Sequence, residues 1–299
     1  MTKAVIFQYG DYSNGARNLS NELKKGGRNS LHTLRSSGGG MRLASTIYGD
    51  TPLTEPHVCI CWGKPALSNA NTPNRLFLNW ANKENIINKK RFFWDYAYET
   101  RNPTNVRFPK TFYSRAEAIE GMTTIGRGEG NVVLVERHNL TGHSGDGIRL
   151  VKEGDEVSSN AGLYVQYIPK AEEYRVHFFK TTGQFWVQQK KLKANAIESD
   201  TRYTIRNHHN GWVYCTEDLN VPEDVLEQAR RFVAHPYNKL DFGAIDIIYN
   251  RRQNQAYVLE VNSAPGVEGR TVSWYAQQVK DTVARHNFSG TNNFFSPII

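Results

Sequence analysis

The chain has 299 residues, of which 39% are hydrophobic and 12% aromatic, so it can bury a core and form two or three subdomains. No stretch approaches the roughly 20 apolar residues of a membrane span, and the N-terminus MTKAVIFQYG does not have the pattern of a signal peptide, so we expect a cytoplasmic protein. The formal net charge of +8 favours anionic partners, either a nucleotide or an acidic polymer such as nucleic acid. No run of five like charges marks a dedicated nucleic-acid arm.

The first part of the chain has the pattern of a small α/β domain. Residues 3–10 form an apolar run that predicts a buried strand, and a helical pattern follows through Leu23. The serine- and glycine-rich stretch 30–40 predicts a loop, and residues 57–62 predict a second strand. Aromatic residues at helical spacing over 79–97 predict a helix that leads out of this domain, so we place its boundary near Asn85.

The second part begins with a predicted hairpin, strands 131–137 and 148–151, whose connecting loop is rich in glycine. Glycine lets the backbone approach an anion closely, and hydroxyl and guanidinium groups add hydrogen-bond donors. The candidate anion-binding residues in this hairpin are Arg137, Gly142, Ser144, Gly145 and Gly147. The spacing is not that of a phosphate-binding loop motif, and a plain flexible turn is the alternative.

Residues 163–179 predict two short strands joined by a polar connector. In the second strand Glu173 and Arg175 lie on one face, whereas Tyr174, Val176 and Phe178 lie on the core face. Residues 185–193 predict a further strand, which ends in lysines that include Lys190. Arg175 either pairs with Glu173 on the surface or, held on a rigid strand, binds a phosphoryl oxygen.

Three oxygen-bearing side chains occur on the last predicted hairpin, which joins the apolar runs 243–249 and 256–262. A loop over 251–255 would place Asp246 opposite Glu260, with Asn262 on the same face. The opposite face would then be filled by Ile245, Ile247, Tyr257, Leu259 and Val261. Opposed carboxylates repel each other, and a hard cation such as Mg²⁺ removes that cost, so the pattern predicts a magnesium site. A solvated pair of acids at a sheet edge is the alternative.

The order of these pieces resembles the ATP-grasp superfamily, and within it the ribosomal-protein glutamate ligases and their lysine-biosynthesis relatives. In those ligases a strand-loop-strand lid precedes a YVQEYI-like hinge, a D-I-R-V strand and a closing V-D-L…N-E-V-N pair. This chain has VVLVER…GHSGDGI, YVQYI, EYRV, AIDII and LEVNSAPGVEG in the same order, between about residues 88 and 276. The resemblance implies an α+β fold in which two subdomains grip ATP, preceded by a small α/β domain. We therefore expect an N-terminal domain over 1–85, an ATP-grasp domain over 86–286 with a lid over about 110–163, and a tail over 287–299.

The resemblance also implies roles for matching residues. Asp246, Glu260 and Asn262 would bind Mg²⁺ or Mn²⁺, and Arg175 would steady the phosphorylated substrate. The remaining expected nucleotide contacts are Lys89 or Lys90, Arg137, the lid residues, the hinge residues Gln166, Tyr167 and Ile168, the ribose contact Glu173, and Lys190. Arg206 and Asn207 match a substrate loop. Two departures stand out, since Arg137 replaces a usual lysine and the hinge is one residue shorter than in the glutamate ligases.

The implied reaction is ATP-dependent ligation of a carboxylate and an amine through an acyl phosphate, with small-molecule or peptide substrates. Positioning and charge neutralisation dominate such chemistry, which is consistent with the lack of a nucleophilic serine or cysteine pattern. Two alternatives remain at this level. One is a phosphotransferase of the same fold that acts on a hydroxyl group. The other is a non-catalytic, basic nucleic-acid-binding protein.

Overall fold

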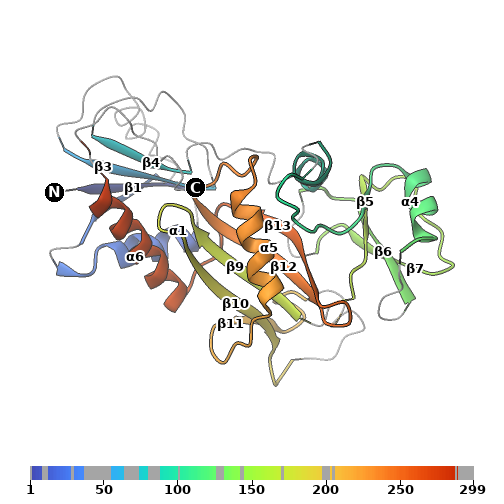
Figure 1. Ribbon diagram of the computed structural model, residues 1–299. Coiled ribbons are helices and arrows are strands. Elements are labelled where there is room, and N and C mark those ends of the chain that lie inside the picture. The colour runs from blue at the N-terminus through green and yellow to red at the C-terminus, as the bar shows by residue number, and fades with distance from the viewer. Residues whose placement is uncertain are drawn as a thin grey trace.

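The computed structural model describes residues 2–8, 13–27, 30–36, 55–63, 74–79, 88–99, 102–125, 131–141, 145–169, 172–196, 203, 206–286 and 288. The predicted boundary at Asn85, the lid residues Gly142 and Ser144, and all of the tail except Phe288 lie outside the described residues. The described chain contains three sheets, which follow one another along the molecule in Figure 1. None of the described helices is long and apolar enough to span a membrane.

The N-terminal sheet is parallel, as expected for an α/β unit. Its order is β2-β1-β3-β4, with β1 (Lys3–Gln8), β2 (His32–Ser36), β3 (His57–Trp62) and β4 (Arg75–Leu78). Helix α1 (Asn14–Leu23) follows β1, and Ser13 caps it by accepting the Ala16 N–H at 3.2 Å. The predicted loop over 30–40 is wrong for β2, because parallel pairing with β1 brings this polar segment into the sheet.

The N-terminal sheet shares its core with the C-terminal part of the chain. Helix α6 (Arg270–Arg285) packs against α1, and the two helices lie side by side in Figure 1. Tyr275 and Val279 of α6 are fully buried in the same apolar cluster as Ile6 and Ile60. Burial of these side chains therefore joins the first and last segments of the chain into one packed unit.

Part of the helix that the sequence predicts over 79–97 lies in the described residues, where it is confirmed. Asn79 follows β4 with a left-handed φ of 60°, and helix α3 (Lys89–Phe93) has Asn88 as its N-cap. A six-residue π-helix, η3 (Trp94–Glu99), continues α3. Phe92, Phe93 and Tyr96 are buried in the main core, so burial of these aromatic residues holds this short helix in place.

The lid sheet has the order β5-β8-β6-β7 and is antiparallel. It comprises β5 (Thr111–Phe112), β6 (Val132–Arg137), β7 (Ile148–Lys152) and β8 (Leu163–Gln166), with α4 (Arg115–Met122) packed beside it. The predicted hairpin between 131–137 and 148–151 is confirmed. The lid lies at the far end of the molecule from the N-terminal sheet in Figure 1.

The central sheet is antiparallel and has the order β11-β10-β9-β12-β13. Its strands are β9 (Glu172–Phe179), β10 (Gln184–Leu192), β11 (Trp212–Cys215), β12 (Phe242–Asn250) and β13 (Gln255–Asn262). Helix α5 (Glu223–Ala234) covers one face, where Val225, Ala229 and Phe232 pack on Tyr174, Val176 and Phe178. The opposite face carries the polar side chains, including Glu173 and Arg175, as the alternation in β9 predicted.

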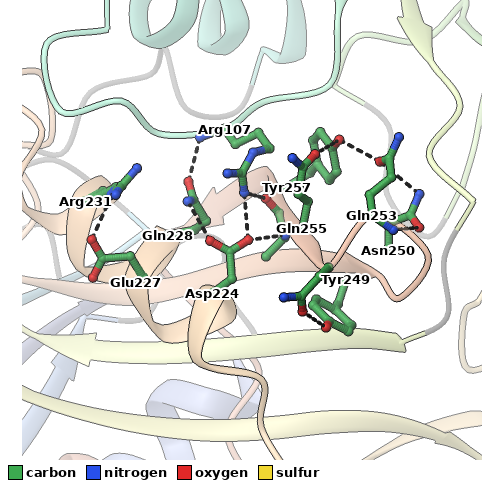
Figure 2. Close-up of polar contacts among 12 residues, drawn as sticks. Arg107, Asp224, Glu227, Gln228, Arg231, Tyr249, Asn250, Gln253, Gln255 and Tyr257 are labelled. Carbon is green, nitrogen blue, oxygen red and sulfur yellow. Dashed lines mark hydrogen bonds and ion pairs between the residues drawn. The ribbon is translucent and has the colours of Figure 1, made fainter.

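A polar network anchors the entry to the lid on the central sheet (Figure 2). Asp224 of α5 accepts hydrogen bonds from Arg107 Nη1 at 2.7 Å and from the Ala256 N–H at 2.5 Å. Gln228 accepts the Arg107 N–H at 2.7 Å, and the Val258 N–H donates to the Arg107 carbonyl at 2.8 Å. One helix therefore holds both the chain segment that enters the lid and the edge strand β13.

Candidate active site

A cavity of about 1110 Å³ lies between the lid sheet and the polar face of the central sheet. Most of the residues that the sequence singled out line this cavity, although they come from widely separated segments. The described lining includes Lys89, Arg137, Gly145, Gln166, Tyr167, Ile168, Glu173, Arg175, Lys190, Arg206, Asn207, Asp246, Glu260 and Asn262. Lys90 and Gly147 are not in the lining, and a side chain at Gly147 would clash with Asn139, so this glycine serves the turn itself.

A single row of side chains crosses the floor of the cavity. The strand registers place Gln188 opposite Arg175, Arg175 opposite Asp246, and Asp246 opposite Glu260. Four strands therefore present one polar group each along a line. A second row lies two residues away along the same strands. It contains Tyr214, Lys190, Glu173 and Ile248.

The predicted pairing of Asp246 with Glu260 is confirmed, but the hairpin reaches it in a different way. The turn is one residue shorter than predicted, because Asn250 pairs with Gln255. A β-bulge after Asp246 restores the register. The bulge also turns Tyr257 and Leu259 toward Ile168 and Ile248 on the cavity side, while Val258 enters the core, so the predicted core positions of Tyr257 and Leu259 are wrong.

Arg175 binds Asp246 rather than Glu173. The Arg175 Nε–Asp246 Oδ1 distance is 2.7 Å and the Nη2–Oδ2 distance is 2.8 Å, which is a two-pronged guanidinium–carboxylate pair. Burial opposes charge on both groups and raises the pKa of Asp246, while the carboxylate raises the pKa of Arg175 above its usual value. Glu173 pairs instead with Lys190, whose Nζ also donates to the Arg206 carbonyl at 2.6 Å. The surface pairing of Arg175 with Glu173 is therefore excluded.

Lys89 forms an ion pair with Glu260 and lines the cavity, whereas the neighbouring Lys90 is exposed. Burial raises the pKa of Glu260, but the adjacent Lys89 outweighs this effect and holds the pKa well below its usual range. Of the two lysines left open by the sequence, the geometry brings Lys89 to the site.

Arg137 carries a buried nitrogen that has no partner among the described residues. Its Nε makes no hydrogen bond within the described residues, and burial lowers the pKa of the guanidinium although Glu260 opposes this shift. A buried guanidinium N–H without an acceptor is costly, so an anion fits at this position.

An apolar end of the cavity adjoins the hinge. Ile168, Ile248, Tyr257 and Leu259 form a small cluster there. The Gln166 N–H donates to the Lys110 carbonyl at 2.8 Å and the Tyr167 N–H donates to the Val133 carbonyl at 3.0 Å. Both N–H groups therefore form hydrogen bonds within the protein, and Ile168 lines the cavity beside them.

Asp246, Glu260 and Asn262 bring carboxylate and amide oxygens together in the lining of the cavity. Asn262 Nδ2 donates to Glu260 Oε1 at 3.3 Å, which leaves the amide oxygen available as a ligand. Carboxylate and amide oxygens are the ligands that Mg²⁺ prefers. No cluster of three or more His, Cys, Asp or Glu side chains suited to a metal occurs in the described part of the chain, so the amide has to complete this set.

The predicted substrate residues Arg206 and Asn207 also line the cavity. The Arg206 guanidinium stacks on Trp212 with 4.5 Å between its Cζ and the ring centroid. Asn207 Oδ1 accepts the Asn210 N–H at 2.8 Å and so stabilises its own turn. Thr271 lines the cavity beside Gln188, whose Nε2 donates to Thr271 Oγ1 at 3.0 Å.

The sequence did not single out Tyr214, Gln188, Thr271 or Arg270, which also line the cavity. The alternation in WVYC and in FWVQQKKLK would have grouped Tyr214, Gln188 and Lys190 by face once the pairing of these strands was known. Thr271 and Arg270 begin α6, and only the docking of that helix brings them to the site.

The fold agrees with that of a group of solved ligase structures. No family model matches the sequence, and no curated protein does so either. The structure matches D-alanine–D-alanine ligase from Bacillus anthracis at 14% identity and a TM-score of 0.59, over 95% of this chain and 98% of that chain. It matches the ATP-grasp ligase PsnB, solved with a minimal precursor, at 12% identity and a TM-score of 0.61, over 95% and 99% of the two chains.

A third similar structure is the macrocyclase MdnC from Microcystis aeruginosa, bound to its precursor peptide MdnA. The identity is 12% and the TM-score 0.59, over 96% of this chain and all of that one. The chain therefore has the ATP-grasp fold, as the sequence resemblance predicted.

Proposed function

We propose that this protein is an ATP- and Mg²⁺-dependent ligase that joins a carboxylate to an amine through an acyl phosphate. The observation that carries the proposal is the lining of the cavity, where the ion pairs Arg175–Asp246 and Lys89–Glu260 occur together with the Arg137 Nε, which has no partner among the described residues. Such a site can neutralise a triphosphate with its metal and still present cationic donors to the phosphoryl group in transfer.

The two ends of the cavity support the same function. The apolar cluster at the hinge suits an adenine ring, and the phosphates would then extend toward Arg137 and Lys89. Gly145 of the lid also lines the cavity. When bound, Mg²⁺ held by Asp246, Glu260 and Asn262 would offset the negative charge on the phosphate oxygens.

The proposed reaction has two steps, phosphoryl transfer to the carboxylate and attack by the amine. A carboxylate oxygen of the first substrate attacks the γ-phosphorus, the bond from that phosphorus to the bridging oxygen breaks, and ADP leaves. The amine nitrogen of the second substrate attacks the acyl carbon, phosphate leaves, and the nitrogen loses a proton. Arg175 would hold the phosphoryl oxygens, and Arg206 with Asn207 would contact the substrate.

The test of the proposal uses pools of candidate substrates. PsnB was solved with a minimal precursor and MdnC with a precursor peptide, so peptides belong in the test beside free amino acids. We expect ADP release when the protein is incubated with Mg²⁺-ATP and pools of amino acids and acidic peptides, together with an amide product detected by mass spectrometry.

The controls separate the alternatives. Asp246→Asn and Glu260→Gln should abolish ADP release, whereas Arg230→Ala, an exposed change on α5, should leave it intact. A phosphorylated hydroxyl product without an amide would identify a phosphotransferase. Salt-sensitive binding of nucleic acid with no ATP turnover would identify a binding protein and contradict the proposal.

A further inference from the structure

Tyr214 has a buried hydroxyl group that no atom of the described residues satisfies. It lies in β11, opposite Lys190, and lines the cavity. Its Oη is buried and makes no hydrogen bond with the described residues. A buried hydroxyl without a partner loses its hydration and gains nothing in return, so such a group inside a cavity indicates a ligand atom that completes it.

Two cations fix the ring of Tyr214. The Arg175 guanidinium lies over the ring, with 4.4 Å between its Cζ and the centroid, and the Lys190 ammonium lies 5.4 Å from the same centroid. Arg175 itself is held by Asp246. The ring is therefore packed in one orientation, which gives the hydroxyl a defined place beside Arg175.

The electrostatics favour a donor role for this hydroxyl. Burial raises the pKa of Tyr214 far above its usual value, and the carboxylates of Asp246, Glu173 and Glu260 add to the shift while Arg175 opposes it. The phenol thus stays protonated at neutral pH and can act as a hydrogen-bond donor. The neighbouring cations would draw an anion to the same place.

From this geometry we infer that the Tyr214 hydroxyl donates a hydrogen bond to an oxygen of the phosphoryl group held by Arg175. This inference rests on the proposed function, because it needs a nucleotide in the cavity. Tyr214 would then act together with Arg175, which supplies charge, while the phenol supplies one directed donor to the same group.

Binding of two nucleotides tests the inference. Affinities for Mg²⁺-AMPPNP, which has a γ-phosphoryl group, and for Mg²⁺-ADP, which lacks one, are measured by isothermal titration calorimetry for the wild type and for Tyr214→Phe. The phenylalanine keeps the ring and its contacts with both cations. We expect AMPPNP to bind about 10- to 100-fold more weakly to Y214F, with ADP unchanged, as is typical of a lost hydrogen bond to a charged group.

A matched variant controls for the loss of any tyrosine hydroxyl. Tyr96 is in the core, and its hydroxyl donates to the Tyr237 carbonyl at 3.1 Å. Tyr96→Phe should lower the melting temperature and leave both affinities unchanged, whereas Y214F should melt no lower than the wild type because it removes an unsatisfied group.

Other binding results would contradict either the Tyr214 inference or the proposed function. If Y214F binds AMPPNP as the wild type does, or loses AMPPNP and ADP affinity equally, the inferred contact with the phosphoryl group is wrong. If the wild type binds neither nucleotide, the proposed function fails instead, and the two failures cannot be confused.

Discussion

Arg175 and Asp246 lie directly opposite each other on β9 and β12 and form two parallel hydrogen bonds of 2.7 and 2.8 Å. The residue expected to hold a phosphoryl group is thereby locked to the residue expected to hold the metal. Each group is mostly buried, with side-chain exposures of 18% and 9%, so neither charge would be stable there without the other. The pair therefore contributes to folding and organises the site at once.

Breaking this pair should be costly. Arg175→Ala leaves the Asp246 carboxylate buried without its partner, and we expect a loss of about 3–5 kcal/mol in the free energy of unfolding, measured by denaturant titration. In an Asp246→Asn background the same change should cost much less, because no charge is stranded. Equal losses in the two backgrounds would show that the pair is not energetically coupled.

Asp241 should lower the stability of the protein as the pH rises. It lies at the start of β12 and accepts the Asn79 N–H at 2.5 Å, and burial raises its pKa to about 6. Between the unfolded value of 3.8 and about 6, the unfolded chain releases this proton while the folded chain retains it, so the contribution of Asp241 to stability falls as pH rises. Asp241→Asn keeps an acceptor for Asn79 and carries no charge.

The expected gain from Asp241→Asn, relative to the wild type, grows by up to about 3 kcal/mol between pH 4 and pH 7. Melting temperatures of both proteins across this range measure it. A constant difference over the whole range would contradict the prediction.

His177 should act in the opposite direction. It lies on β9 two residues after Arg175, its Nε2 is 2.9 Å from Gln188 Oε1, and burial lowers its pKa to about 3. Since the unfolded histidine takes up a proton below about pH 6.5 and the folded one does not, stability present above this pH is lost as pH falls toward 3. His177→Gln should flatten this acid limb of the stability curve. An unchanged acid limb would show that His177 is not the group responsible.

The Asp224 network of Figure 2 should control the attachment of the lid. Asp224→Ala removes the acceptor for Arg107 Nη1 and for the Ala256 N–H, and we expect a loss of about 2–4 kcal/mol and faster proteolysis within residues 102–110. Arg230→Ala on the same helix removes only exposed ion pairs and should cost less than about 1 kcal/mol. Similar losses in both variants would contradict a specific role for Asp224.

The sequence predicted much of the site because strand periodicity is a local property. Alternation in 243–249 and 256–262 was enough to place Asp246, Glu260 and Asn262 on one face, and the alternation in β9 was enough to separate Glu173 and Arg175 from Tyr174 and Val176. The bulge after Asp246 shows the limit of this reasoning. The bulge compensates for a turn that is one residue shorter than predicted, so Asp246 still pairs with Glu260. It also moves Tyr257 and Leu259 to the face opposite the one predicted.

What the sequence alone determined is the set of chemical groups and the face of each strand on which they lie, since both follow from residue type and the two-residue repeat. The tertiary structure alone decided which groups meet. Arg175 reaches Asp246 because β9 pairs with β12 across an intervening stretch that contains β10, β11 and α5, and Lys89 reaches Glu260 from a helix 171 residues away in the chain. Such contacts depend on the burial of whole faces of the sheet, which is a property of the complete chain and of no local segment.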